Sequence, residues 1–328
     1  MVKHAIIKVD QNFWEAVSSG RVKAFVLDYS LRELEPGSFC VLKGESEGTR
    51  IVVYGKIRVK EAKELSVEDC KAYIEKGLVY VLKEPKTRCF LVEFDEFESY
   101  EGLGLEFLES EDLRSKIKGK GYIDDNDLKA LEENIAKLRK LSELGQKIRE
   151  LPGFEDVVSL QDLVSSPHEC ARLMLLQIGR ALGFETYVPR GEDKLQCKDI
   201  PLGKYASTEL PPELRGFSEY IKTVDIIWYK PHYCFMFEVE LQNIDEKLSR
   251  FYDASLLNAR FYIVSYPEYR EDFEKGRERF PVIKDRTFFI SISDLLKYYY
   301  AFLLLQGVKS DLCKIEMLKF SCPDICEK

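Results

Sequence analysis

The chain lacks any run of eighteen apolar residues, and its first residues show no signal-peptide pattern. Since a transmembrane helix needs about 20 apolar residues, we expect a cytoplasmic protein with no membrane partner. Asparagine and glutamine are also scarce, at five and seven of 328 residues, while lysine and glutamate abound. This bias is typical of hyperthermophile proteins and indicates an archaeal or otherwise thermophilic source.

Histidine is rare as well, since the chain contains three. Each is isolated, and we interpret His168 and His232 as solvated surface residues rather than as general bases or ligands. Nine cysteines are scattered and odd in number, a pattern that favours reduced thiols over a disulfide framework. Cys313, Cys322 and Cys326 gather near the end, but three loosely spaced sulfurs give only a weak zinc signal.

Positive charge is not in excess, because the net charge is −8. This argues against non-specific adhesion to nucleic acid, which depends on Lys and Arg neutralising phosphates. A length of 328 residues with 45% hydrophobic residues predicts two domains with real cores. We place a β-rich domain at residues 1–121, a charged helical linker at 122–150 and a mixed α/β domain at 151–328.

Two β-rich runs in the C-terminal part carry three carboxylates. Asp225 lies near the start of V-D-I-I-W-Y, and Glu238 and Glu240 end F-M-F-E-V-E. Side chains alternate along a strand, so the two glutamates share one face while Phe237 and Val239 share the other. Clustered carboxylates repel one another unless a hard cation such as Mg²⁺ neutralises them. The pattern predicts a metal site, and the alternative is that these residues are solvated or paired with Lys or Arg.

The elements around these runs follow the order helix, strand, strand, strand, helix, strand. The first helix begins at Ser166-Pro167-His168-Glu169, which offers an N-cap, a proline at the first helical position and a capping-box glutamate. Asn243 can cap the second helix, and R-F-Y-I-V-S-Y from Arg260 is typical of a buried strand. This order predicts a mixed α/β core.

At these residues the chain resembles the PD-(D/E)xK nuclease superfamily, which has the restriction-endonuclease-like fold. The resemblance implies Asp on the second core strand and (D/E)-x-K on the third, so Asp225 and Glu238 match the metal ligands. Glu240 departs from the pattern, because it stands where the family usually has lysine. Several members bring a glutamate of the first helix to the metal, which makes Glu169 a further catalytic candidate. The alternative is that Glu169 closes a capping box with Ser166.

The resemblance implies phosphodiester hydrolysis with Mg²⁺ or Mn²⁺ as cofactor. Such ions activate water, stabilise transition-state charge and assist the leaving oxygen. We assign Asp225, Glu238 and Glu240 as metal ligands and catalytic residues, with Glu240 positioning or deprotonating water or binding a second ion. Without the lysine the site either depends more strongly on metal or is inactive, and the sequence leaves both open.

The N-terminal region alternates short apolar runs with turns, which predicts strands at 5–9, 22–28, 38–42, 50–59 and 89–96 and helices at 12–19 and 66–77. Its motifs A-I-I-K-V, L-E-P-G-S-F-C-V-L and Y-G-K-I resemble the PUA-like superfamily, particularly the ASCH and EVE branches. The resemblance implies a β-barrel that binds RNA or holds a modified base. The chain departs from the ASCH motif G-x-K-x-x-E-x-R, because it has Gly20-Arg21-Val22-Lys23-Ala24-Phe25 and then no matching Glu and Arg.

Three aromatic residues, Trp14, Phe25 and Tyr29, are candidates for the wall of such a base pocket, and Lys23 is the candidate cation. A base stacks on an aromatic ring with about 1–3 kcal/mol. The alternative for each aromatic residue is a place in the core.

These features together predict a metal-dependent DNA endonuclease whose PUA-like domain recognises an unmodified or modified base. Double-stranded DNA is the expected partner, and a homodimer is attractive because cutting both strands usually takes two sites. One alternative is a nucleic-acid-binding protein whose nuclease fold has lost activity. Another is an RNA-directed factor whose C-terminal domain is a platform for partner proteins.

Overall fold

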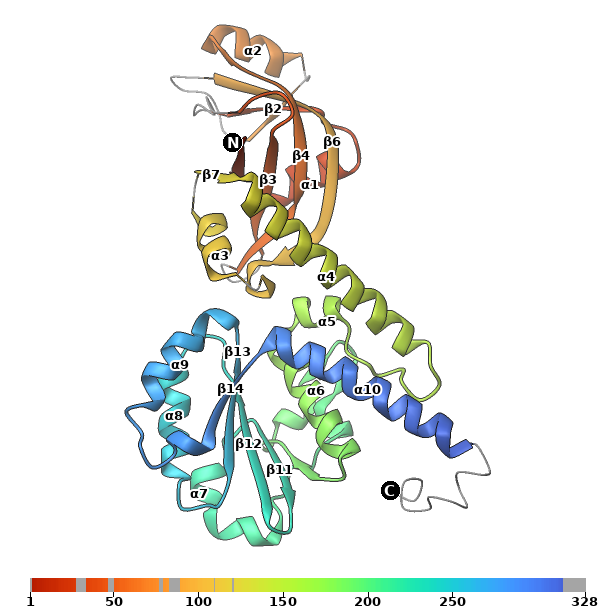
Figure 1. The fold of residues 1–328 in the computed structure, drawn as a ribbon, viewed down its shortest axis with the longest axis vertical. Helices are drawn as coiled ribbons and strands as arrows, with labels where there is room; N and C mark the ends of the chain where they lie inside the picture. The colour runs from red at the N-terminus through yellow and green to blue at the C-terminus, as the bar shows by residue number, and fades with distance from the viewer. Residues whose placement is uncertain are drawn as a thin grey trace. The chain divides into compact units, whose positions relative to one another are not determined.

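The computed structural model describes residues 2–27, 34–46, 50–76, 79–82, 89–108, 110–119 and 121–314. The chain forms two compact units, Met1–Lys137 and Leu138–Lys328, which are described separately below (Figure 1). The division falls inside the long helix α4 (Asp125–Arg149). The domain boundaries at 121 and 150 lie on either side of it and stay predictions. Among the described residues no helix has the length and apolarity needed to cross a membrane.

The first unit contains one seven-stranded sheet with the order β5-β2-β6-β4-β3-β1-β7. Its strands are β1 (Lys3–Lys8), β2 (Ala24–Leu27), β3 (Phe39–Ser46), β4 (Arg50–Leu65), β5 (Tyr80–Val81), β6 (Cys89–Gly104) and β7 (Gly121–Asp124). β1 pairs with β3, and β2 with β5, in parallel, while the other pairs are antiparallel. Among the described residues, β5 and β7 are not hydrogen-bonded to each other. The described sheet therefore has two edge strands, whereas a closed barrel was predicted.

The helices of the first unit are α1 (Gln11–Ser18), α2 (Val67–Glu75) and α3 (Glu111–Lys118), with the 3-10 turn η2 (Leu105–Phe107). Each of the three helices begins at a residue whose side chain accepts a hydrogen bond from the first-turn backbone, as at Asp10 and Ser66. Phe13 and Val17 of α1 pack into the core of the sheet. The first half of α4 also belongs to this unit and buries Leu128 and Leu131.

The second unit is built on a five-stranded mixed sheet with the order β14-β13-β12-β11-β8. The strands are β8 (Glu185–Tyr187), β11 (Ile226–Lys230), β12 (Tyr233–Val239), β13 (Arg260–Ser265) and β14 (Thr287–Ser291). β11 runs antiparallel to its two neighbours, β8 and β12, whereas β13 and β14 run parallel to β12. A separate hairpin pairs β9 (Gln196–Cys197) with β10 (Ile200–Pro201).

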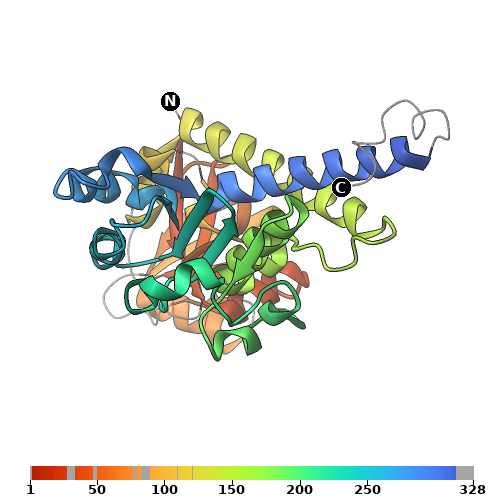
Figure 2. The same cartoon turned by 90° about the horizontal axis from the view of Figure 1, so that it is seen from below.

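The helices of the second unit are α5 (Leu160–Ser165), α6 (Pro167–Ala181), α7 (Ser218–Ile221), α8 (Ile244–Asp253), α9 (Arg270–Arg277) and α10 (Ile292–Lys314). The 3-10 turns are η3 (Glu192–Lys194), η4 (Leu202–Lys204), η5 (Pro212–Phe217), η6 (Pro267–Tyr269) and η7 (Lys284–Arg286). α6 and α10 lie beside each other (Figure 2), while α8 and α9 pack on the opposite face of the sheet through Leu248, Phe251 and Phe273. The run α6, β8, β11, β12, α8, β13 therefore has the order predicted from the sequence.

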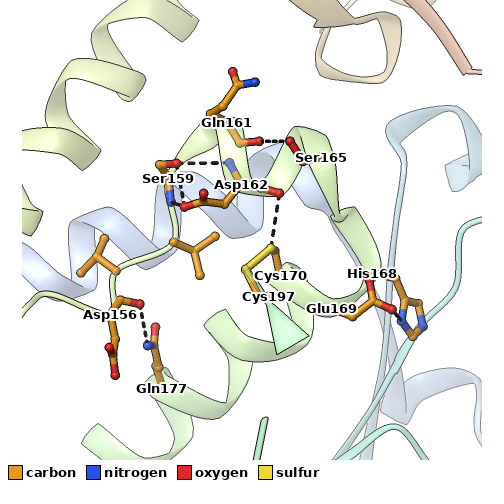
Figure 3. Close-up of a disulfide and its surroundings, with 12 residues drawn as sticks. Asp156, Ser159, Gln161, Asp162, Ser165, His168, Glu169, Cys170, Gln177 and Cys197 are labelled. Carbon is orange, nitrogen blue, oxygen red and sulfur yellow. Dashed lines mark hydrogen bonds and ion pairs between the residues drawn. A yellow bond between two sulfur atoms is a disulfide. The ribbon is translucent and has the colours of Figure 1, made fainter. Parts of the chain in front are cut away.

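The cysteines differ from the expectation of reduced thiols. Cys70 pairs with Cys89, and Cys170 with Cys197 (Figure 3). Parity and spacing could not reveal these pairs, because each joins segments that meet only in the folded chain. Cys40 and Cys234 are buried free thiols. The weak zinc signal lies outside the described residues, apart from the backbone of Cys313 in α10.

Candidate functional site

Two of the predicted carboxylates meet across the antiparallel pair β11 and β12. The register places Ile226 opposite Phe237, so Asp225, one residue before β11, lies opposite Glu238 and on the same face. The backbone N–H of Val239 donates to Asp225 Oδ2 at 2.8 Å. The predicted alternation also holds, because Phe237 lies on the other face of the sheet. Its ring packs against that of Trp228, with ring centroids 4.5 Å apart, and Trp228 lies next to α6.

Glu238 is a fully buried carboxyl group, with 0% of its surface exposed. Burial, together with the charge of Asp225, raises the pKa of Glu238 from 4.5 to about 8. Its Oε2 accepts a hydrogen bond from Lys247 Nζ at 2.8 Å. Its Oε1 has no hydrogen-bond donor in the described part of the chain, and the cation nearest to it is Arg250, whose Nη1 lies 3.9 Å away. A buried carboxylate oxygen without a hydrogen bond is costly unless a ligand satisfies it.

Lys247 supplies a cation that the strand motif lacks. It projects from α8 and is 9% exposed, and its Nζ lies 3.7 Å from Glu240 Oε2 as well as 2.8 Å from Glu238. Burial lowers the pKa of Lys247, but the charges of Glu238 and Asp225 outweigh it and hold the pKa above its ordinary value. The ammonium group of Lys247 therefore lies between the two glutamates of E-x-E. In the PD-(D/E)xK pattern the lysine is on the strand itself, at the position of Glu240. Sequence reasoning missed it, although a lysine in the first turns of the helix that follows an acidic strand was an available signal.

Glu240 lies on the same side as Glu238 but has another set of partners. Its Oε1 accepts the backbone N–H groups of Gln242 at 2.7 Å and Asn243 at 3.0 Å, at the entry to α8. Burial raises the pKa of Glu240, but these backbone donors and Lys247 outweigh it and hold the pKa below its ordinary value. Glu240 is therefore an ionised residue of the turn that also contacts Lys247.

Glu169 does not close the expected capping box. Ser166 is the N-cap of α6 but makes no side-chain cap hydrogen bond, and the capping box forms one helix earlier, between Ser159 and Asp162. Glu169 Oε1 instead lies 3.6 Å from His168 Nδ1 (Figure 3), and the hydrogen bond with His168 lowers the pKa of Glu169.

His168 also approaches the carboxylate pair, because its Nε2 lies 3.8 Å from Asp225 Oδ2. The interpretation of His168 as an isolated surface residue was therefore wrong, since its ring lies between Glu169 and Asp225. Its position depends on a contact between residues 168 and 225, which no local pattern encodes.

A complete three-ligand metal group is not assembled here. Among the described residues, no three His, Cys, Asp or Glu side chains come together in a metal-binding arrangement. The reason is visible in the contacts, because Lys247 separates Glu238 from Glu240 and the turn engages Glu240. Asp225 and Glu238 remain as a carboxylate pair in which one oxygen of Glu238 lacks a hydrogen bond, a donor set that suits a hard divalent cation.

The aromatic candidates of the first unit have different environments. Phe25 is 0% exposed and contacts Phe13 in the core, so it cannot stack on a base and that assignment is corrected. Trp14 is half-buried and stacks on Tyr54, with ring centroids 5.6 Å apart and planes 12° apart. Tyr29 lies outside the described residues.

Lys23 lines an open pocket of about 400 Å³. Apolar residues and Tyr73 line it together with a second exposed lysine, Lys60. Lys60 interacts electrostatically with Asp95 of the same pocket, whereas Lys23 forms no ion pair with a carboxylate in the part of the chain that the structure describes. The lining residues are Lys23, Ala24, Lys60, Tyr73, Val79, Leu91, Glu93, Phe94 and Asp95.

Comparisons with known proteins give one structural similarity. No family model matches the chain, and no curated protein matches it. Crystal structures of ASCH from Zymomonas mobilis and of two of its single-residue mutants are 9–11% identical to it, cover 40% of this chain and 94–96% of their own, and give TM-scores of 0.30–0.32. A TM-score at this level does not establish a common fold, so both family resemblances stay predictions.

Proposed function

We propose that the second unit is a metal-dependent endonuclease that hydrolyses phosphodiester bonds of double-stranded DNA. The observation that carries this proposal is the buried pair of Asp225 and Glu238, with one oxygen of Glu238 that lacks a hydrogen bond and the Lys247 ammonium beside it. A buried acid with a strongly raised pKa and a specific cationic partner is typical of a functional site.

Asp225 and Glu238 are the residues that would hold Mg²⁺ or Mn²⁺. When bound, such an ion supplies an activated water and stabilises charge on the phosphoryl oxygens. Glu238 must be deprotonated to act as a ligand, and Lys247 favours that state through its hydrogen bond. Lys247 then provides the positive charge for the transition state, and Glu240 keeps it in place from the turn.

The cleavage test uses purified protein with unmodified duplex DNA, cytosine-modified duplex DNA and RNA, each in Mg²⁺, in Mn²⁺ and in chelator. We expect metal-dependent cleavage of DNA, and a loss of at least about 100-fold in Asp225→Asn, Glu238→Gln and Lys247→Met. Lys275→Met is the matched control, because Lys275 lies on α9 with 68% of its side chain exposed. Equal cleavage by Glu238→Gln and the parent protein would remove the site from the reaction.

We propose that the first unit recognises a base of the nucleic acid. The pocket beside Lys23 combines apolar residues, the Tyr73 ring and two exposed lysines, which suits a base attached to a phosphate. Titration of labelled DNA and RNA, with and without modified bases, into the parent protein and into Lys23→Ala tests this assignment. Unchanged affinity for every ligand would contradict it.

A second candidate function is nucleic-acid binding without cleavage. The Lys247–Glu238 ion pair favours it, because the ammonium neutralises the site without any metal. In that case substrate would bind equally well in chelator, no substrate would be cut, and Mn²⁺ would not raise the melting temperature. The RNA-directed factor is distinguished by binding RNA in preference to DNA. Sedimentation with and without DNA tests the expected homodimer.

A further inference from the structure

A disulfide joins the helix that carries His168 and Glu169 to the hairpin of β9 and β10. Cys170 follows them directly in α6, and Cys197 lies in β9 of the hairpin between β8 and β11 (Figure 3). Both cysteines are buried, at 0% and 1% exposure. The bond therefore fixes the segment 191–204, which contains η3, β9, β10 and η4, against the first turns of α6.

The side chain of Arg172 also connects the same segment to the carboxylate site. Arg172 is 1% exposed, and its guanidinium pairs with Glu192 in η3. The same Nη2 atom donates to the backbone carbonyl of Asp225 at 3.2 Å. Arg172 thus contacts both the hairpin segment and the backbone of a site residue, so a shift of Glu192 changes the charge balance beside Asp225.

This ion pair depends on the segment staying in place. Glu192 has 36% of its side chain exposed, so water can replace the arginine as its partner. Arg172 is buried, and its Nε lacks a hydrogen-bond partner in the described part of the chain. Without Glu192 it keeps the carbonyl of Asp225 and the nearby charge of Glu169. Breaking a buried ion pair by removing one partner is strongly destabilising.

The reduced form also has a place in the fold. Cys170 Sγ lies 3.4 Å from the backbone carbonyl of Asp162. A thiol at Cys170 can donate to this oxygen, so the reduced form of Cys170 has an acceptor. The reduced state of Cys170 is therefore compatible with the packing of α5 on α6.

We propose that the Cys170–Cys197 disulfide is a redox-sensitive latch that holds Arg172 and Asp225 in place through the segment 191–204. A dithiol reductant breaks the S–S bond by transferring two electrons and two protons, which yields two cysteine thiols, while the reductant becomes a disulfide. The segment is then held by the Arg172–Glu192 pair, by the contacts of Lys204 with Asp156 and Arg180, and by its own backbone bonds. Regulation of catalysis by this latch rests on the proposed function, whereas its structural test does not.

Two rates measured on the full-length protein, without metal and without substrate, test the latch. The first is trypsin cleavage after Lys194 and Lys198, which are exposed in the segment. The second is amide exchange at Val239, whose N–H donates to Asp225 Oδ2 and so reports the position of that carboxylate. Samples are compared as oxidised protein and after dithiothreitol treatment and anaerobic desalting. Digests are fully reduced before separation so that linked fragments come apart.

We expect reduction to accelerate both rates about tenfold, because the segment changes from a covalently fixed state to one that opens locally. Cys170→Ser with Cys197→Ser should show the fast rates in both conditions. Cys70→Ser with Cys89→Ser is the matched control, because it removes the other disulfide and should keep the full response of the parent. If the first double variant does not fold, the reduced parent protein still decides the question.

Identical rates in oxidised and reduced parent protein would overturn the latch. Faster trypsin cleavage with unchanged exchange at Val239 would overturn its link to Asp225. A response that disappears in the Cys70→Ser, Cys89→Ser protein would assign the effect to the first unit instead. None of these outcomes depends on nuclease activity, so a failure of the cleavage assay and a failure of the latch are separate results.

Discussion

Replacing Glu238 by glutamine should change the stability of the protein in a pH-dependent way. Glutamine has nearly the shape of a protonated glutamate and cannot ionise. The pKa of Glu238 is raised from 4.5 to about 8 in the folded protein, first by burial and then by Asp225. Between these two pH values the folded protein therefore keeps a proton that the unfolded chain releases, so the stability of the parent falls as the pH rises.

The size of the effect follows from the shift. The full change in pKa corresponds to about 5 kcal/mol of unfolding free energy between pH 4.5 and pH 8. The group is 0% exposed, so solvent screening does not reduce this value much, but relaxation around the ion pair with Lys247 makes it an upper bound. We expect Glu238→Gln to match the parent near pH 4.5 and to be more stable by at least about 2 kcal/mol at pH 8.

Urea unfolding in chelator at half-unit steps from pH 5 to pH 8.5 measures this difference. Glu185→Gln is the control, because Glu185 is an exposed residue of β8 in the same sheet. A second series with Mn²⁺ should reverse the order at pH 8, because only the parent retains the complete carboxylate pair to bind the ion. If the two proteins differ by the same free energy at every pH, Glu238 is not the buried acid described above.

Four further predictions follow from the contacts. Lys247→Met should leave Glu238 without its cation and lower the unfolding free energy by about 3 kcal/mol at pH 8, measured by urea unfolding. Glu240→Gln should reduce the cleavage rate and leave DNA affinity nearly unchanged, since Glu240 holds the turn and Lys247; equal kcat in single-turnover assays would refute this. Trp14→Ala should weaken nucleic-acid binding by about 1–3 kcal/mol if its ring stacks on a base, and unchanged affinity in a fluorescence titration removes it from the interface. A fragment of residues 1–121 should fold alone, and one of residues 1–137 should melt at a higher temperature, because α4 adds buried residues to the first unit; circular dichroism melting measures both.

Local rules predicted the elements that carry the site. The order from α6 to β13 followed from hydrophobic periodicity and capping residues. The placement of Glu238 and Phe237 on opposite faces of the sheet followed from the alternation of side chains along a strand. The sequence predicted that Asp225 joins the cluster from a neighbouring strand, and the register of the antiparallel pair places it opposite Glu238. These features depend on residues within about fifteen positions of one another.

The residues that set the chemistry depend on longer contacts. His168 lies close to the Asp225 carboxylate, and Arg172 donates a hydrogen bond to the Asp225 carbonyl. Both contacts join α6 to a residue more than fifty positions away in the sequence. Cys170 and Cys197 likewise form a disulfide only because the hairpin folds back onto α6.

The sequence by itself therefore determined which strands carry the carboxylates and which face they share, because alternation and turn geometry act between near neighbours. Tertiary packing alone decided that Lys247 of α8 lies between Glu238 and Glu240, that Glu240 serves the turn, and that Phe25 is inside the core. The physical reason is that burial and charge pairing are properties of the space between elements, and that space exists only once α8 and the sheet have packed together.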